Sequence, residues 1–200
     1  MRLYLVRHGQ SLGALQQGLA DPDLTDLGKR QARLVAERLR LENIALLVCS
    51  PLRRSLRTAQ IISSILGLRP QVWPDLMESY DGGGGMTRSE IAAEFPGFTV
   101  NIPEQWWPEE PEDEERLYAR AAGVEAKVRL LGHETDIRIA AVGHGTFGAA
   151  LMSNILGAPP CGYTRFSQNN CCVSILELRP GRAKLIRSND VSHLGPDLLT

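Results

Sequence analysis

The chain has 200 residues, a length that suits one domain, and we expect a single domain over residues 1–200. Its 22 basic and 23 acidic residues give a formal net charge of −1, which disfavours the broad basic face of proteins that bind nucleic acid or anionic membranes. Its four cysteines include no CxxC pair, and no apolar run approaches the roughly 18 residues of a membrane span, so we expect an unprocessed cytoplasmic protein without disulfide bonds.

Strand and helix patterns alternate in the first third of the chain. Residues 3–6 form a short apolar run that is typical of a buried strand. Thr25 then fits the N-cap of a helix whose inward face carries Leu27, Leu34, Val35 and Leu39. Residues 45–49 predict a second strand. Ser50 and Pro51 follow it as the predicted N-cap and first-turn proline of a second helix.

The alternation stops in the middle of the chain. Residues 71–73 predict a weaker third strand, and the Gly- and Pro-rich residues 74–111 follow as an excursion from the core, which we expect to lie near the active site. Within it, residues 87–90 form a capping box for a short helix. Residues 117–131 carry apolar side chains at alternating steps of four and three, which predicts an amphipathic helix that includes Leu131 on its inward face.

The last third returns to alternation. Residues 137–142 predict a strand, Gly143-His144-Gly145 a tight turn, and residues 146–156 a helix ended by Gly157. Residues 173–178 and 183–186 predict a β-hairpin. This order of elements predicts an α/β fold, a three-layer α/β/α sandwich with a mostly parallel central sheet.

Histidine, arginine and glutamate side chains follow the predicted strands. Ligands of open α/β sheets bind beyond the carboxyl ends of the strands, so these side chains are expected at one rim. They are His8, Arg53, Arg54, Arg57, Glu78 and His144. A single histidine after a strand is more often structural, and an Arg-rich first helical turn is usually a solvent-exposed surface. The gathering of all these side chains at one rim is more informative than any of them alone. In addition, each cation in the first turn of a helix costs roughly 0.3–1 kcal/mol because of the helix dipole, and a bound anion reverses this penalty.

Several separated motifs resemble the histidine phosphatase superfamily, which is also named after cofactor-dependent phosphoglycerate mutase. They occur in family order over nearly the whole chain, which makes the resemblance specific, and it implies a phosphoglycerate mutase-like fold. The motifs are Arg7-His8-Gly9-Gln10-Ser11, residues 21–25 with Gly28 and Gln31-Ala32, residues 50–54 with Thr58-Ala59, residues 76–78, residues 142–145 and residues 170–174.

The resemblance also implies a role for each matching residue. His8 is the nucleophile that becomes phosphorylated, and Glu78 is the proton donor. The family spacing from Ser50 selects Arg54 and leaves Arg53 and Arg57 as helix surface or rim. The residues that bind the phosphoryl group or contact the substrate are Arg7, Arg54, His144, Gln17, Gly18 and Gly145.

Phosphoryl transfer requires these residue types on chemical grounds as well. Neighbouring guanidinium groups disfavour imidazolium, so His8 stays a neutral nucleophile. Arg7, Arg54 and His144 can stabilise the equatorial oxygens in place of a metal ion. Glu78 can protonate the leaving alkoxide and then accept a proton from the attacking water. We therefore expect neither a metal nor a cofactor.

The chain departs from the family pattern at a single residue and at a glycine run, both in the predicted site. Ala14 stands where members often carry Asn, so one phosphate-side donor is missing. Residues 82–85 are all glycine where members commonly carry Gly-x-Trp-Glu-Gly, which alters the loop expected to close over the substrate. The effect of both departures on activity stays open.

Three other functions fit parts of the sequence. A phosphoglycerate mutase would need extra basic residues, but only Arg88 lies between Glu78 and the long helix. A non-catalytic phosphate-binding module is disfavoured because every chemical role has a residue. Residues 143–148 match the GxGxxG of dinucleotide-binding oxidoreductases but lack the acidic residue about 20 positions further on.

We therefore predict a metal-independent phosphatase for small phosphomonoesters that works through phospho-His8. The expected partner is a small phosphorylated metabolite, with no nucleic acid and no membrane. The natural substrate stays open, as does the oligomeric state, for which a homodimer is one option.

Overall fold

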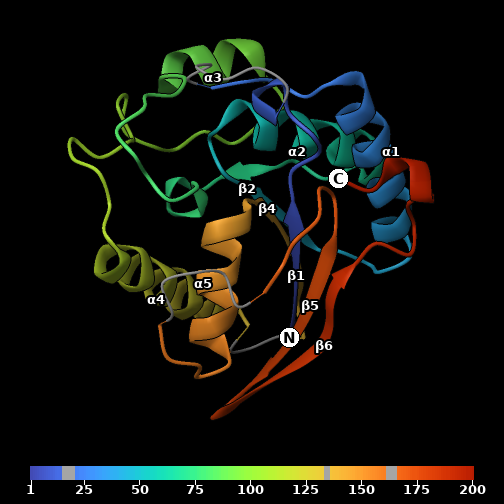
Figure 1. The fold of residues 1–200 in the computed structure, drawn as a ribbon, viewed down its shortest axis with the longest axis vertical. Coiled ribbons are helices and arrows are strands. Elements are labelled where there is room, and N and C mark those ends of the chain that lie inside the picture. Colours follow the sequence, from blue (N-terminus) through green and yellow to red (C-terminus); the bar gives the residue numbers. More distant parts are fainter. Residues whose placement is uncertain (15–20, 133–135, 161–165) are drawn as a thin grey trace.

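The structure, a computed structural model, describes residues 1–14, 21–132, 136–160 and 166–200. In these ranges one sheet has helices on both faces (Figure 1). The strands are β1 (Arg2–Arg7), β2 (Leu46–Cys49), β3 (Gln71–Val72), β4 (Arg138–Gly143), β5 (Val173–Arg179) and β6 (Arg182–Asp190). The helices are α1 (Asp26–Arg40), α2 (Arg53–Leu66), α3 (Arg88–Glu94), α4 (Glu114–Leu131) and α5 (Gly145–Ile155). None of these helices is both long and apolar enough to cross a membrane.

The sheet has six strands in the order β3-β2-β4-β1-β5-β6. The pairs β3/β2, β2/β4 and β4/β1 are parallel, whereas β5 is antiparallel to both β1 and β6. The predicted α/β fold with a mostly parallel sheet is confirmed, and the predicted hairpin adds the antiparallel part. In register, Arg7 lies opposite Gly143. The residues that follow β1 and β4, His8 and His144, therefore emerge side by side.

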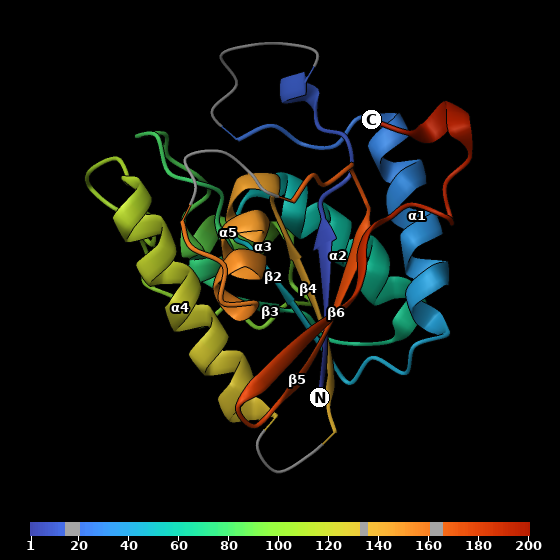
Figure 2. The same ribbon diagram turned by 60° about the horizontal axis from the view of Figure 1, so that its bottom comes forward.

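Alternation along the strands divides the core into two layers. Tyr4 and Val6 of β1 pack in a cluster with α1 and α2, whereas Leu3 and Leu5 pack in a second cluster with α4 and α5. Figure 2 shows these two helix pairs on opposite sides of the sheet. The strands near the centre are thus buried on both faces, which explains their continuous apolar runs.

The start of α2 differs from the prediction. The helix begins at Arg53, and Leu52 at the N-cap position makes no side-chain cap bond. Instead the backbone N–H of Arg53 donates to both carboxylate oxygens of Asp21, at 2.9 and 3.1 Å. Ser50 Oγ, the predicted cap, accepts from the Leu52 backbone N–H at 3.2 Å just before the helix and is also hydrogen-bonded to His144 Nε2 at 2.8 Å. A carboxylate distant in sequence thus supplies the acceptor for the first N–H of α2, in addition to the local serine.

Two predicted inward leucines are exposed. Leu34 is 36% and Leu131 is 40% exposed. On α1 the buried face is shifted to include Gln31, whose amide accepts from the Gln10 backbone N–H and donates to the Leu198 carbonyl. The C-terminal segment covers this side of the helix, a contact that local periodicity does not reveal.

Cys171 and Cys172 lie in the turn that leads into β5. The φ angle of Cys171 is +55°, in the left-handed region, and its backbone N–H donates to the Arg7 carbonyl at 3.0 Å. This turn brings the start of β5 against the end of β1.

The stretch of residues 74–111 packs largely against the α1–α2 side. Met86, Ile91, Phe95 and Phe98 are buried in the cluster that contains those two helices. The predicted capping box of α3 is present, because Thr87 and Glu90 each accept a hydrogen bond from the other's backbone N–H.

We expect a methyl group at Gly28 to destabilise the fold. An ideal Cβ there would lie 2.0 Å from the Gln10 carbonyl oxygen, which is backbone and has little room to move. Gly28→Ala should lower the free energy of unfolding by about 1–3 kcal/mol, measured by urea denaturation. The control is Gly123→Ala in α4, where a Cβ meets no atom of the described residues within 4 Å and should stabilise the helix slightly. Equal unfolding midpoints for the two variants would contradict the expectation.

Candidate active site

A cavity of about 420 Å³ lies at the carboxyl ends of β1, β2 and β3. Arg7, His8, Arg54 and Glu78, which the sequence singled out, line it. The other lining residues are Ser11, Gly13, Ala14, Pro22, Leu52, Met77, Ser79, Tyr80, Asp81, Gly83, Gly84 and Trp106. Gln17 and Gly18, also predicted as substrate contacts, lie outside the described residues. The cavity lies where ligands of α/β sheets bind.

The His8 imidazole is buried and held in one tautomer. Its Nδ1 donates to the Gly9 carbonyl at 2.7 Å, and the Arg54 Nε–H donates to its Nε2 at 3.2 Å. Burial lowers the pKa of His8 well below its ordinary value, and the charges of Arg54 and Arg7 lower it further. His8 is therefore neutral near pH 7, with the lone pair of Nε2 directed toward Arg54.

His144 lies beside His8 but does not line the cavity. The two ring centroids are 5.1 Å apart, and His144 is 1% exposed. Burial lowers its pKa well below the ordinary value, and Arg54, His8 and Arg7 add to the effect. His144 Nδ1 and Arg7 Nε are buried without a hydrogen-bond partner among the described residues. Buried polar groups are usually paired, so this site retains unused hydrogen-bonding capacity.

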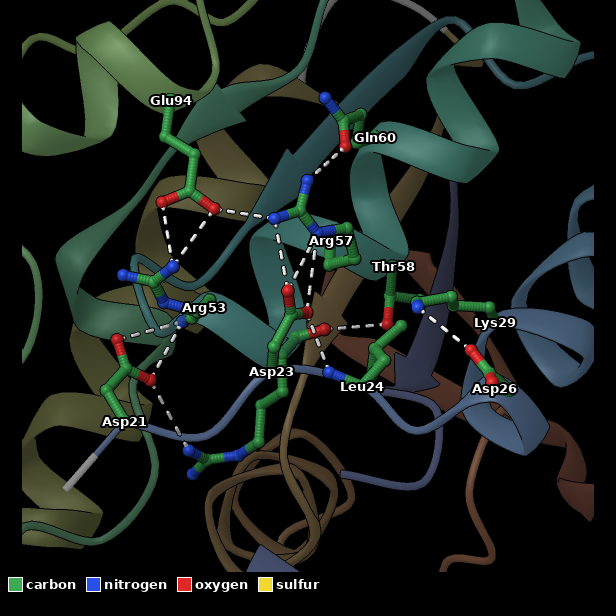
Figure 3. Close-up of polar contacts among 11 residues, drawn as sticks. Asp21, Asp23, Leu24, Asp26, Lys29, Arg53, Arg57, Thr58, Gln60 and Glu94 are labelled. Atoms are coloured by element: carbon green, nitrogen blue, oxygen red, sulfur yellow. Dashed lines mark hydrogen bonds and ion pairs between the residues drawn. The ribbon is translucent and has the colours of Figure 1, made fainter. Parts of the chain in front are cut away.

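The three arginines at the start of α2 differ in their partners. Arg54 contacts His8, and its Nη1 lies 3.8 Å from Asp21 Oδ1. Arg53 and Arg57 instead pair with Glu94 at 2.8 and 2.5 Å, and Arg57 also pairs with Asp23 (Figure 3). Arg53 and Arg57 therefore join α2 to α3.

The Glu78 carboxylate lies at the N-terminus of α5. It accepts hydrogen bonds from the backbone N–H groups of Ser79, Thr146 and Phe147, at 3.0, 3.2 and 2.8 Å. These bonds fix its direction beside the cavity. They also occupy the helix-start N–H groups that a dinucleotide pyrophosphate would need, which argues against the oxidoreductase alternative. Gly145, which was predicted to contact the substrate, is the first residue of α5 and lies against Arg7. A Cβ at Gly145 would be 3.6 Å from the Arg7 Nε.

Arg120 is an anchor of this site that the sequence analysis missed. Its guanidinium donates to the carbonyls of Asp75, Met77 and Glu78, and it pairs with the buried Glu112 at 2.5 Å. It thus fixes the segment that carries Glu78. The only sequence signal was a basic residue on the polar side of an amphipathic helix, which is usually solvent-exposed.

Asp21 is a second missed contributor. Its motif was visible, but its contact with Arg54 depends on the fold. Burial raises the pKa of Asp21 from its ordinary 3.8 to about 6, against the hydrogen bond from Arg53 and the charge of Arg54, which lower it. Asp21 therefore links the N-terminus of α2 to the guanidinium beside His8.

Comparisons with known proteins find similar sequences and structures over most of the chain. A sequence model of the histidine phosphatase superfamily (branch 1) matches residues 3–191. Phosphoserine phosphatase 1 of Hydrogenobacter thermophilus is 29% identical over 98% of this chain and 95% of its own length. A probable phosphoglycerate mutase of Photorhabdus laumondii is 32% identical over 87% of this chain and 83% of its own. The structure of mycobacterial glucosyl-3-phosphoglycerate phosphatase with VO3 has a TM-score of 0.72 and 27% identity, covering 94% of this chain and 98% of that one.

Asp21→Asn should change how stability depends on pH. Because the folded-state pKa of Asp21 exceeds its unfolded value, the wild type should lose stability relative to the variant as pH rises from about 4 to 6. Asn keeps an acceptor for the Arg53 N–H but does not ionise. Above pH 6 the variant should be more stable by roughly 1–3 kcal/mol, measured by urea denaturation between pH 4 and 7.5. A stability difference that does not vary with pH would contradict this expectation.

Proposed function

Because the chain belongs to the histidine phosphatase superfamily, we propose that it hydrolyses small phosphomonoesters through a phosphohistidine on His8. The observation that carries the proposal is the neutral, tautomer-fixed His8 imidazole at the cavity with the Arg7 and Arg54 guanidinium groups. Relatives named phosphoserine phosphatase and glucosyl-3-phosphoglycerate phosphatase support hydrolysis as the reaction.

Binding of the phosphoryl group is the first step. Arg7 and Arg54 carry two positive charges, which match the two negative charges of a phosphomonoester. The Arg54 Nε–H moves from His8 Nε2 to a phosphoryl oxygen, which frees the lone pair of the nucleophile. The bound dianion also offsets the guanidinium charges around His144, so that this imidazole can become protonated and donate a hydrogen bond to a phosphoryl oxygen, while keeping its proton.

Transfer and hydrolysis follow at the same atoms. His8 Nε2 forms a bond to phosphorus as the bond to the leaving oxygen breaks, and Glu78 gives that oxygen a proton. A water molecule then attacks the phosphohistidine and passes a proton to Glu78. The phosphorus–nitrogen bond breaks, which releases inorganic phosphate and neutral His8. Arg7, Arg54 and His144 stabilise the charge on the transferred group, so no step requires a metal ion.

A phosphoglycerate mutase is the second candidate, and the relative at 32% identity with that name favours it. A mutase would use the same phosphohistidine but return the group to a second hydroxyl instead of to water. Phosphate release compared with interconversion of 2- and 3-phosphoglycerate separates the two. We favour hydrolysis because Arg88, the only basic residue between Glu78 and α4, pairs with Glu104 at 3.0 Å and does not line the cavity.

His8→Ala should abolish turnover. Loss of the nucleophile removes the covalent route, so kcat for 4-nitrophenyl phosphate should fall roughly a thousandfold or more. The wild-type protein should keep its activity in EDTA. Acid-labile, base-stable phosphate on the wild-type protein after rapid quenching would report the intermediate. An unchanged urea midpoint would show that the variant folds. Activity that survives in His8→Ala would overturn the mechanism, and strict metal dependence of the wild type would overturn the proposed charge stabilisation.

Glu78→Gln should separate the two proton transfers. Nitrophenolate leaves without a proton, so a burst of one nitrophenolate per active site should persist while steady-state turnover falls about 100-fold or more. Turnover of an alkyl phosphate should fall by at least as much and show no burst, because an alkoxide needs the proton at once. Glu115→Gln on the exposed start of α4 is the matched control and should behave as wild type. Equal, small losses on both substrates would exclude Glu78 as the proton donor.

A further inference from the structure

The charges that line the cavity divide into two groups. Arg7 and Arg54 are its only cations among the described residues, and the proposed reaction uses both for the phosphoryl group. The lining carboxylates are Glu78 and Asp81, and the charge of Asp81 acts on Arg54. The proposed reaction uses Glu78 as the proton donor, so once a phosphate dianion neutralises both guanidinium groups, the remaining lining charge is that of Asp81. A leaving group would therefore meet a negative field.

Other arginines near the cavity are held by carboxylates. Arg53 and Arg57 form ion pairs with Glu94, and Arg57 also with Asp23 (Figure 3). Neither of these two arginines lines the cavity. Arg120 pairs with Glu112 and with backbone carbonyls behind Glu78. Within the described residues, no further cation lines the cavity to receive a second anionic group of a substrate.

Part of the cavity wall is aromatic, and the Trp106 ring in it is held in place. Trp106 lines the cavity, and its Nε1–H donates to the Met86 carbonyl at 2.7 Å. A Cβ on Gly85 would lie 2.7 Å from the Trp106 ring, so the glycine run allows this close contact between loop and ring. Tyr80 and Leu52 also line the cavity. Such a wall suits the carbon skeleton of an uncharged alcohol.

We propose that the substrate is the phosphate monoester of a neutral or cationic alcohol, and that Asp81 disfavours leaving groups with a second negative charge. The inference rests on the proposed phosphatase function and narrows its substrate class. Asp81 acts as a specificity residue through its charge, because it lies at the cavity and near Arg54. The proposal excludes two kinds of substrate, the phosphate esters of hydroxy acids and the bisphosphates.

A matched pair of esters tests the proposal. Glycerol 3-phosphate and 3-phosphoglycerate differ at one carbon, which is a neutral hydroxymethyl in the first and a carboxylate in the second. We expect kcat/KM for glycerol 3-phosphate to be at least about five- to tenfold higher, as for one repulsion between partly exposed charges. Phosphoethanolamine, whose leaving group is cationic, should be hydrolysed at least as well as glycerol 3-phosphate. The preference should shrink in 0.5 M NaCl.

Variants assign the preference to one carboxylate. Asp81→Asn should reduce the ratio of kcat/KM for glycerol 3-phosphate to that for 3-phosphoglycerate by about three- to fivefold, mainly through KM for 3-phosphoglycerate. Asp81→Lys should reduce the ratio further or invert it. The matched control is Glu109→Gln, an exposed acid of the same stretch that does not line the cavity, and it should leave the ratio unchanged.

Binding to His8→Ala, measured by calorimetry with the same two esters, reports the preference without turnover. The substrate class would be overturned if the wild type had equal kcat/KM for 3-phosphoglycerate and glycerol 3-phosphate and if His8→Ala bound the two esters equally well. A ratio unchanged in both Asp81 variants would overturn the role of Asp81. Failure to hydrolyse 4-nitrophenyl phosphate and all three esters would instead overturn the proposed function. Preferential binding of glycerol 3-phosphate by His8→Ala would then still support the charge argument.

Discussion

The parallel pairing of β1 with β4 at the centre of the sheet is the constraint on which the site depends. Its register sets Arg7 opposite Gly143, so the chain leaves both strands at one level and places the His8 and His144 rings 5.1 Å apart. Because both strands are buried on two faces, a slip by one residue would exchange the side chains that pack on α1 and α2 with those that pack on α4 and α5, and would disrupt the close packing of both layers. Hydrophobic packing thus fixes the position of the two histidines.

Burial and charge then act together on these imidazoles. Both lie in a desolvated region beside Arg54 and Arg7, and each influence disfavours the protonated ring. The protein can concentrate two cations here at a net charge of −1 because neighbouring arginines are paired elsewhere. The local field depends on which guanidinium groups face the cavity, as those of Arg7 and Arg54 do, although Arg54 also lies 3.8 Å from the Asp21 carboxylate.

Long-range carboxylates complete both helix starts at the site. Asp21 accepts from the first N–H of α2, and Glu78 accepts from N–H groups at the start of α5. Each helix therefore begins at a carboxylate that also lies near the proposed phosphoryl-binding region. This arrangement couples the position of Arg54 to Asp21 and that of Glu78 to α5, and Arg120 holds the Glu78 segment from behind.

The sequence by itself determined the order of strands and helices, because local periodicity and caps such as Thr25 and Thr87 report on neighbouring residues. It also placed His8, Arg54, Glu78 and His144 after strands, and parallel strands deliver such residues to one rim. Only the tertiary structure decided that Asp21 caps α2 and Arg120 anchors Glu78. It also decided that Arg57 turns away to Glu94 and Leu34 stays exposed. These outcomes depend on contacts between residues far apart in the chain, for which a local pattern contains no signal.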